Sequence, residues 1–385
     1  MRILHTSDWH VGKKLGRFDR MEDHAAVLDE IVHIADEESV DLVVVSGDLF
    51  DRPAPPVEAL SLTVDTLRRL ARDDRPVVGV AGNHDSAELF ELLGRLMKSW
   101  NIHLVGEIKR PAEGGVLDLM AGGTRALVAC FPFLREGKVV DFMQEVDQWY
   151  GAYAERVARL CQAYNASLEQ QKDANTVTLL TAHFLVSGAR LGGEGAPRGE
   201  RLLHIGESYA ATEQAIPPGP QYVAMGHIHA PQAVPGAAVP AAYAGSTLEL
   251  DFGEAGEGKR VVLVDVTPGL PATVSSRPLT CGRKLLRARG TLEELRAQDE
   301  LQGAFVDLTV ETEGPQEDLA QQVKEDFPLM VKVRADYARV EEEPTEARQE
   351  LPWDDLYQAY YRKTHEIDPK DELMAAFRQI YDEVS

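Results

Sequence analysis

Five short polar stretches, each directly after an apolar run, constrain the fold of this chain more than any other feature. Each carries side chains that bind metals in proteins: SDWH (Asp8, His10), GDLFD (Asp48), GNHD (Asn83, His84), TAHF (His183) and GHIH (His227, His229). In an α/β sheet, ligands collect at the carboxyl ends of the parallel strands. One such residue is usually a turn or capping residue, but five groups at successive strand ends predict a shared metal site on an α/β fold.

The order of the apolar segments supports this fold class. Continuous apolar runs, typical of strands buried on both faces, alternate with segments of helical spacing. The expected strands cover residues 2–5, 41–46, 76–80 and 102–105, and the expected helices cover residues 20–38, 57–72 and 87–97. Residues 116–274 are richer in strands and contain one long helical pattern over residues 139–170. The sequence therefore predicts a layered α/β sandwich with a mixed sheet.

The pattern of expected helices and strands changes in the last third of the sequence. We expect an α/β domain over residues 1–275, a small βαβαβ domain over residues 276–338, an acidic linker over residues 339–352 and two helices over residues 353–385. Asp368 is the expected N-cap of the last helix, with Pro369 as its first residue.

The donor set narrows the choice of metal. It contains two carboxylates, one amide oxygen and four imidazoles without a thiolate, which favours Mn²⁺, Fe²⁺ or Zn²⁺ over Ca²⁺ or a cysteine-type zinc site. Seven ligands suit two ions that share a carboxylate, about 3.5–4 Å apart, an arrangement used in phosphoryl transfer.

Local spacing adds two expectations. Side chains at i and i+2 of an extended segment point the same way, so Asp8 with His10, and His227 with His229, are each expected to act as a two-residue clamp. Glycines beside the ligands let the backbone turn sharply and approach an ion closely. They are Gly47, Gly82 and Gly226.

The order D-x-H, G-D, G-N-H-D, H, G-H-x-H resembles the calcineurin-like metallophosphoesterase superfamily over the first 275 residues. The resemblance implies one ion on Asp8, His10 and His229. It implies a second ion on Asn83, His183 and His227, with Asp48 bridging the two. His84 is similar to the catalytic, non-ligand histidine of the superfamily. That residue is implied to contact the scissile phosphate and to stabilise charge or protonate the leaving oxygen.

The stretches LHTSDWHVGKKL, VSGDLFDRPAP and GVAGNHDS, with the two C-terminal modules, resemble the SbcD family of bacterial double-strand-break repair nucleases over nearly the whole chain. This resemblance implies a Mn²⁺-dependent 3′→5′ exonuclease on duplex DNA that also cuts single strands and hairpins. It further implies a homodimer, an SMC-like ATPase partner (SbcC), a small domain that caps the cleft, and C-terminal helices that dock on the partner. Related proteins often carry histidine after GDLF, where this chain has Asp51, so a second histidine role does not transfer.

Several residues near the motifs keep two interpretations each. Asp85 either orients a ligand imidazole or caps the following helix, and the sequence favours neither. Arg52 either contacts phosphate or, as the sequence favours, forms a surface ion pair. Arginines around the glycine-rich stretch 188–201 either form a phosphate-contacting rim or belong to a solvated loop. They are Arg190, Arg198 and Arg201.

The two terminal helices carry aromatic and aliphatic stripes at helical spacing. The stripe residues are Trp353, Tyr357 and Tyr360 on the first helix and Phe377 and Ile380 on the second. The stripes either pack on the protein itself or dock in a groove of a partner, and the resemblance favours docking.

The stretch GEAGEGK, residues 253–259, matches G-x-x-x-x-G-K but is not expected to be a phosphate-binding loop. Arg260 stands where such a loop has Ser or Thr, and a strand rather than a helix follows, so we expect a hairpin turn.

Composition limits the function classes. The net charge of −23 argues against binding polyanions by general attraction, so local cations or a partner must hold any nucleic acid. Three scattered cysteines, no N-terminal secretory pattern and no long apolar window predict a cytoplasmic protein without a membrane span.

Two alternatives to a nuclease remain. One is a small-molecule or cyclic-nucleotide phosphodiesterase on the same fold, which has no need of residues 276–385. The other is a DNA-end tether with a vestigial metal site, against which the complete ligand set argues.

Overall fold

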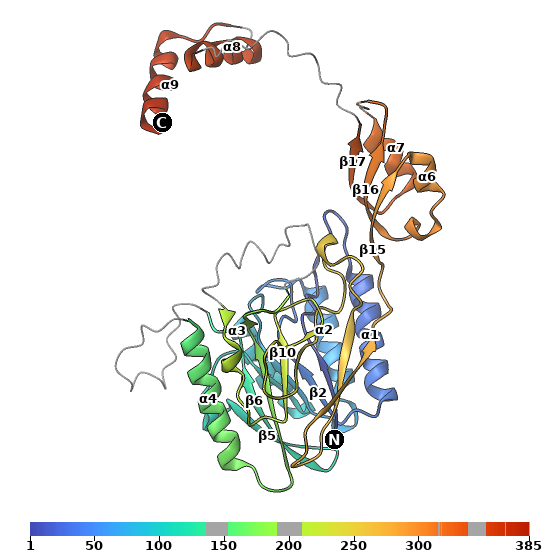
Figure 1. The fold of residues 1–385 in the computed structure, drawn as a ribbon, viewed down its shortest axis with the longest axis vertical. Coiled ribbons are helices and arrows are strands. Elements are labelled where there is room, and N and C mark those ends of the chain that lie inside the picture. Colours follow the sequence, from blue (N-terminus) through green and yellow to red (C-terminus); the bar gives the residue numbers. More distant parts are fainter. Residues whose placement is uncertain are drawn as a thin grey trace. The chain divides into compact units, whose positions relative to one another are not determined.

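The computed structural model describes residues 1–135, 153–190, 210–314, 316, 318–337, 352–365 and 367–384 (Figure 1). The chain forms two compact units. The first comprises Met1–Glu311 with Glu317–Ala335, and the second comprises Thr312–Gln316 with Asp336–Ser385. None of the helices in the described ranges has the length and apolar character that crossing a membrane requires.

The first sheet of the large unit has the strand order β14-β13-β1-β2-β3-β4. Its strands are β1 (Arg2–Thr6), β2 (Leu42–Val45), β3 (Val77–Val80), β4 (Ile102–Val105), β13 (Arg260–Asp265) and β14 (Thr273–Pro278). Strands β1 to β4 are parallel, and β13 and β14 add an antiparallel edge. The crossovers between parallel strands are helical, as parallel pairing requires. They are α1 (Met21–Glu37), α2 (Val57–Leu70) and α3 (Ala87–Met97).

The second sheet has the order β11-β12-β10-β7-β6-β5. Its strands are β5 (Val116–Ala121), β6 (Thr124–Phe131), β7 (Thr176–His183), β10 (Tyr222–Gly226), β11 (Gln232–Ala233) and β12 (Ala241–Tyr243). The four central strands are parallel and both edge strands are antiparallel. A short ribbon pairs β8 (Leu185–Val186) with β9 (Ala210–Ala211).

Three apolar layers hold the two sheets and their helices together. Helices α1 to α3 cover the outer face of the first sheet, and α4 (Tyr153–Gln171) covers the outer face of the second (Figure 1). Between the sheets, Val44 and Val78 pack in one cluster with Val128 and Leu179. The fold is thus a four-layer α/β sandwich, which confirms the expected class, although it contains two mixed sheets instead of one.

The expected βαβαβ module is also present. It consists of β15 (Leu285–Gly290), α6 (Leu292–Arg296), β16 (Phe305–Glu311), α7 (Leu319–Asp326) and β17 (Met330–Asp336). Helix α6 begins at a capping box formed by Thr291 and Glu294. Leu295 and Val323 from the two helices pack on the sheet. Strand β14 of the first sheet continues to Pro278, past the expected domain limit at residue 275.

The second unit contains two helices, α8 (Trp353–His365) and α9 (Asp371–Val384). The rings of Tyr357 and Phe377 stack with their centroids 4.1 Å apart. The expected N-cap of α9 is wrong, because the helix begins at Asp371 and the Asp368 carboxylate accepts a hydrogen bond from Arg362 instead.

Short 3₁₀ turns and the long helical pattern account for the remaining helical segments. Single 3₁₀ turns are η1 (Arg72–Asp74), η2 (Lys98–Trp100), η3 (Pro111–Glu113), η6 (Glu213–Ala215), η7 (Phe252–Glu254) and η8 (Asp299–Leu301).

Of the helix expected over residues 139–170, the structure describes α4 from Tyr153, and residues 139–152 lie outside the described ranges.

Candidate metal centre

Every candidate ligand ends or follows a parallel strand. Asp8 and His10 follow β1, Asp48 follows β2, and Asn83 with His84 follows β3 in the first sheet; His183 ends β7, and His227 with His229 follows β10 in the second. Ligand side chains from the two sheets lie about 3 Å apart, so these carboxyl ends meet, as the parallel topology predicts.

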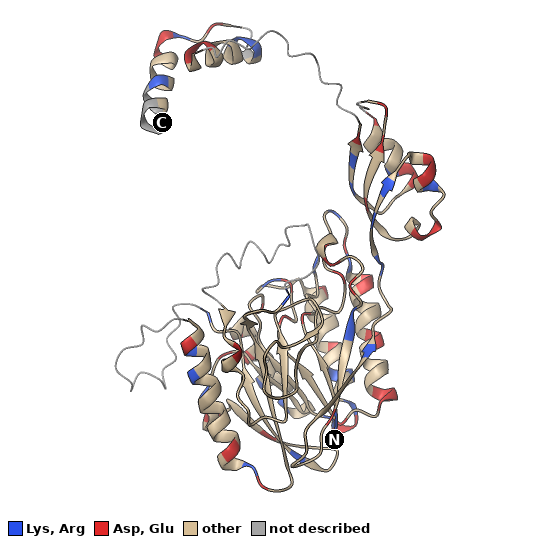
Figure 2. Ribbon diagram, in the orientation of Figure 1, with Lys and Arg blue, Asp and Glu red and all other residues tan. Residues whose placement is uncertain are grey.

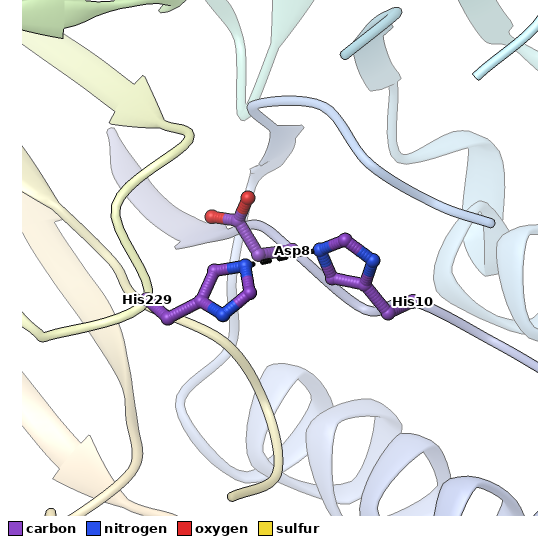
Figure 3. A group of neighbouring side chains, drawn as sticks. All are labelled: Asp8, His10 and His229. Atoms are coloured by element: carbon purple, nitrogen blue, oxygen red, sulfur yellow. Dashed lines mark hydrogen bonds between the residues drawn. The ribbon is translucent and has the colours of Figure 1, made fainter. Parts of the chain in front are cut away.

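One group of ligand atoms comes from both sheets. Nε2 of His10 lies 3.1 Å from Nε2 of His229. Each of Asp8, His10 and His229 offers one ligand atom, and these atoms lie within 4.8 Å of one another (Figure 3). All three residues are buried.

A second group surrounds Asn83. Its Oδ1 lies 3.0 Å from Nε2 of His183 and 2.9 Å from Nδ1 of His227. The carboxylate of Asp48 connects the two groups, because its Oδ2 lies 3.5 Å from Nε2 of His10 and 3.4 Å from Nε2 of His183. The arrangement therefore offers two adjacent sites with one shared carboxylate.

The hydrogen bonds behind the ligands show that this donor set fits cations. Nδ1 of His183 lies 2.7 Å from the Ser46 carbonyl, which can only accept, so Nδ1 carries the hydrogen. Burial alone would lower the pKa of His183, but the Asp48 carboxylate raises it to about 9, so the oxygens of Asp48 and Asn83 require a positive charge at Nε2. A proton supplies that charge in the metal-free protein, and in the neutral ring the Nε2 lone pair is open to a metal cation. Acceptors that face one another in a buried site favour a cation among them.

Three of the four ligands expected on extended segments have left-handed backbone, which contradicts that expectation. Asp8, His10 and His227 have φ values of 51°, 45° and 95°, so neither motif is an extended segment with alternating side chains. His227 joins the Asn83 group and His229 joins His10, so the expected His227–His229 clamp is wrong. Left-handed backbone at non-glycine residues costs about 1–3 kcal/mol each and clusters at functional sites.

The three glycines beside the ligands leave space for ligand side chains. A Cβ atom on Gly47 would lie 2.2 Å from Nδ1 of His183, and one on Gly82 would lie 2.0 Å from Oδ1 of Asp48. A Cβ on Gly226 would lie 1.9 Å from the Ser46 carbonyl oxygen. Each position therefore excludes any larger residue without movement of the site.

His84 lies against this centre with one free ring nitrogen. Its Nδ1 lies 2.9 Å from the Asp51 carbonyl oxygen, so Nδ1 carries the hydrogen. Its ring centroid lies 4.7 Å from that of His10, and its buried Nε2 has no hydrogen-bond partner among the described residues. The main chain of Asp51 thus orients His84.

Asp85 supports the loops that carry Asp48 and Asn83. Its carboxylate accepts hydrogen bonds from Gly82 N at 2.9 Å, Phe50 N at 3.0 Å and Leu49 N at 3.3 Å. Burial, together with the neighbouring Asp48 carboxylate, raises the pKa of Asp85 above its ordinary range. The cap of α3 is Ser86, whose Oγ accepts from Leu89 N.

Two of the four arginines considered as phosphate contacts, Arg52 and Arg190, lie in the described ranges. Arg52 is exposed and forms no ion pair with the residues that the structure describes, contrary to the interpretation that the sequence favoured. Arg190 is exposed, and its backbone N–H donates to the side chain of Gln232 at 2.8 Å. Arg198 and Arg201 lie outside the described residues.

The stripes on the terminal helices divide into two sets. Tyr357 and Phe377 pack on each other, whereas Trp353 and Tyr360 remain 60% and 63% exposed. The side chain of Ile380 is not among those that the structure describes.

Sequence reasoning missed Glu254 and Lys259. The stretch that holds them is not a hairpin turn, because the following strand β13 pairs with β1 and β14. Oε1 of Glu254 lies 2.7 Å from Nδ1 of His229, and Nζ of Lys259 donates to Oε2 of Glu254 at 2.6 Å. Burial alone would raise the pKa of Glu254, but Lys259 and His229 hold it well below its ordinary value.

Comparison with known proteins agrees with this geometry. The pattern of the calcineurin-like phosphoesterase family matches residues 1–231, and that of the type 5 capsule protein repressor C-terminal domain matches residues 281–365. The chain is 32% identical over 323 residues to the SbcD component of nuclease SbcCD from Bacillus subtilis, covering 80% of this chain and 79% of that one.

Proteins of the same name from other bacteria match over similar lengths. The Rhodobacter capsulatus protein is 30% identical over 335 residues, 82% of this chain and 81% of its own. The Escherichia coli K12 protein is 29% identical over 301 residues, 77% and 73% respectively. The chain therefore belongs to the calcineurin-like phosphoesterase family and, within it, to the SbcD group of metal-dependent phosphodiesterases.

Proposed function

We propose that this protein is a Mn²⁺-dependent DNA nuclease that degrades duplex DNA from 3′ ends and cuts single strands and hairpins, together with an SbcC-type ATPase, in double-strand-break repair. The observation that carries the proposal is the convergence of six ligand side chains around a seventh, Asp48, with His84 beside them. The relatives are named as components of the SbcCD nuclease.

The proposed ligand assignment follows the two observed groups. Asp8, His10 and His229 would hold one ion, Asn83, His183 and His227 would hold the other, and Asp48 would contact both. When bound, such a pair lowers the pKa of water and neutralises charge on the reacting phosphate. Oxygen and imidazole donors without thiolate are compatible with Mn²⁺.

In this proposal His84 acts on the substrate and not on the metals. Its Nδ1 is held by the Asp51 carbonyl, so its Nε2 is directed to the centre. In the protonated ring, Nε2–H would donate to the scissile phosphate and to the departing 3′ oxygen. Help of this general-acid type contributes about 10²–10⁴-fold to a rate.

A protein with a net charge of −23 needs local cations to hold DNA. Figure 2 shows basic and acidic residues interspersed on the described elements, with acidic ones gathered around α6. Exposed arginines on the strands of the small module are candidates for phosphate contact in addition to Arg52 and Arg190. They are Arg287, Arg289 and Arg334.

We propose that the ATPase partner supplies the remaining affinity for DNA and that α8 and α9 dock on it. The exposed rings of Trp353 and Tyr360 would be the anchors. Exposed apolar side chains on and beside α2 and α3, among them Val57 and Leu96, make this face the candidate for a homodimer contact.

Domain limits and location complete the proposal. The catalytic domain would extend to the end of β14 at Pro278 instead of to residue 275, followed by the capping domain up to residue 338, the linker 339–352 and the docking helices 353–385. A cytoplasmic location suits the free cysteines Cys130, Cys161 and Cys281.

The test is digestion of an end-labelled linear duplex by the purified protein with Mn²⁺ or Mg²⁺, with an Asp8→Ala variant as control. Products shortened from the 3′ end with Mn²⁺, and absent with the variant, are expected. Hydrolysis of bis-p-nitrophenyl phosphate without digestion of DNA, even with the ATPase added, would favour a small-molecule phosphodiesterase. A purified protein that binds no metal would favour a tether.

A further inference from the structure

A buried carboxylate lies within hydrogen-bond distance behind the ring of His229. Nδ1 of this ring lies 2.7 Å from Oε1 of Glu254, which is 1% exposed. Since an ionised carboxylate can only accept, Nδ1 carries the hydrogen, and Nε2 of the neutral ring faces His10 with a lone pair. By contrast, Nδ1 of His183 is held by a neutral backbone carbonyl.

The carboxylate of Glu254 is itself fixed in place. Its second oxygen accepts from Nζ of Lys259 at 2.6 Å, from Oγ of Ser246 at 3.0 Å and from the backbone N–H of Leu250 at 3.3 Å. With both oxygens engaged, the carboxylate cannot rotate away from His229 without breaking several buried hydrogen bonds.

The same segment also holds the backbone of His229. Nζ of Lys259 donates to the His229 carbonyl oxygen at 3.1 Å, and the backbone N–H of Ser246 donates to it at 3.2 Å. Lys259 is 6% exposed, so these contacts are shielded from water. Ring and main chain of His229 are therefore both fixed by residues 246–259.

Neighbouring contacts keep this segment rigid. Phe252, two residues before Glu254, packs in one cluster with Leu285 and Phe305 of the small module. The Glu249 carboxylate accepts from Gly256 N at 2.6 Å and from Leu285 N at 2.9 Å. The anchoring lets the carboxylate impose an orientation on His229 instead of following it.

We propose that Glu254 is a positioning residue for the metal centre and that Lys259 holds it in place, so that this pair sets the affinity for the ion bound by Asp8, His10 and His229. The inference rests on the two-metal centre proposed above. Partners of this kind fix the ring and raise ligand basicity, and their loss typically weakens metal binding about 10–100-fold.

The test is calorimetric titration of Mn²⁺ into the full-length, metal-stripped protein. The main variant is the double substitution Glu254→Leu with Lys259→Met, because it removes both charges of the buried pair together, and Glu257, which also contacts Lys259, is partly exposed to solvent. We expect wild-type protein to bind two ions. The double variant should bind one of them about 10–100-fold more weakly and the other within about twofold of wild type.

Two further variants sharpen the titration. Glu254→Gln keeps the shape of the side chain but removes its charge, and it should weaken the same ion to a smaller extent. The control is Lys172→Met, which removes the ammonium of another Glu–Lys ion pair, that with Glu169 of α4, and it should bind both ions like wild type.

The outcomes separate the two proposals. Double-variant protein that binds both ions like wild type, or that loses both equally, would overturn the role of Glu254. Wild-type protein that binds fewer than two ions would overturn the two-metal centre itself, before any variant is considered.

Discussion

His84 and the seven ligands differ in what their ring nitrogens and oxygens contact. Nε2 of His84 has no hydrogen-bond partner among the described residues, although a ring nitrogen of His84 lies within 4.8 Å of ligand atoms of His10 and Asp48. The hydrogen bond between His84 and Asp48 comes from the backbone N–H of His84, which donates to Oδ1 at 2.9 Å and does not depend on the side chain. The side chain of His84 can therefore be removed without removing a ligand.

We expect His84→Ala to bind both ions with wild-type affinity and to lose cleavage by about 10²–10⁴-fold. Mn²⁺ titration and digestion of end-labelled duplex by the same preparation would measure both properties. His183→Ala is the matched control, since it should lose metal as well as cleavage. Loss of metal from His84→Ala would contradict its assignment as a residue that acts on the substrate.

Gly82 lies where a side chain would collide with the bridging carboxylate. A Cβ atom there would lie 2.0 Å from Oδ1 and 2.5 Å from the backbone nitrogen of Asp48. We expect Gly82→Ala to displace Asp48, to weaken binding of both ions and to lower the free energy of unfolding by about 1–3 kcal/mol.

Mn²⁺ titration and urea denaturation would measure these two effects of Gly82→Ala. The control is Gly314→Ala, because a Cβ atom on Gly314 meets nothing within 4 Å. Its stability should change by no more than about 0.5 kcal/mol. Normal metal binding by Gly82→Ala would show that the loop has room that the structure does not indicate.

The sequence predicted which side chains gather, because each ligand ends or follows an apolar strand and parallel strands share an edge. It could not predict the contact between His229 and Glu254. That contact depends on the path of the chain between β10 and β13, where no periodic pattern marks the position. The left-handed backbone at Asp8 and His10 could not be predicted either, since it arises from the tertiary environment.

Helices and strands of the α/β sandwich follow their sequence patterns closely. The bounds of α3 and β4 agree with the apolar periodicity residue for residue, because Ser86 caps α3 and Asn101 turns the chain before β4. Asp368 shows the limit of such signals. A favourable N-cap and proline predicted the start of α9, but the ion pair with Arg362 competes for the carboxylate.

The terminal helices allow internal packing and docking to be tested separately. Tyr357 and Phe377 stack between α8 and α9, while Tyr360 is 63% exposed. We expect Tyr360→Ala to leave the helical content unchanged and to weaken binding of the purified ATPase about tenfold or more, as loss of an aromatic anchor does. Phe377→Ala should lower the helical content measured by circular dichroism.

The control for docking is Ile367→Ala, which removes an exposed apolar residue between the two helices. It should bind the ATPase like wild type. Equal binding by Tyr360→Ala and Ile367→Ala would exclude the exposed face of α8 as the docking surface.

The two sheets of the large unit are joined by a buried polar network as well as by apolar packing. His5 on β1 contacts the Tyr222 hydroxyl on β10 at 2.9 Å and the Ser46 hydroxyl at 3.0 Å. The Ser46 hydroxyl in turn lies 3.0 Å from the hydroxyl of Thr181 on β7. His5 thus connects elements of both sheets, and its protonation would place a charge between them.

Burial lowers the pKa of His5 from 6.5 to about 3. Between these pH values the unfolded chain binds a proton that the folded chain does not. The stability contributed by neutral His5 is therefore complete above pH 6.5 and is lost as the pH falls toward 3, by up to about 1.4 kcal/mol per pH unit.

Urea denaturation at several pH values between about 7.5 and 5, in the presence of a chelator, would measure this slope for the whole molecule. His5→Gln should be less stable at neutral pH but should lose less stability on acidification than wild type, because the group that takes up the proton is gone. His33→Gln is the control, since His33 is 71% exposed on α1 and should keep the wild-type slope. The chelator removes the separate contribution of metal release, and the difference in slope between wild type and His5→Gln then reports the junction between the sheets. Identical slopes for His5→Gln and wild type would mean that acid weakens the fold elsewhere.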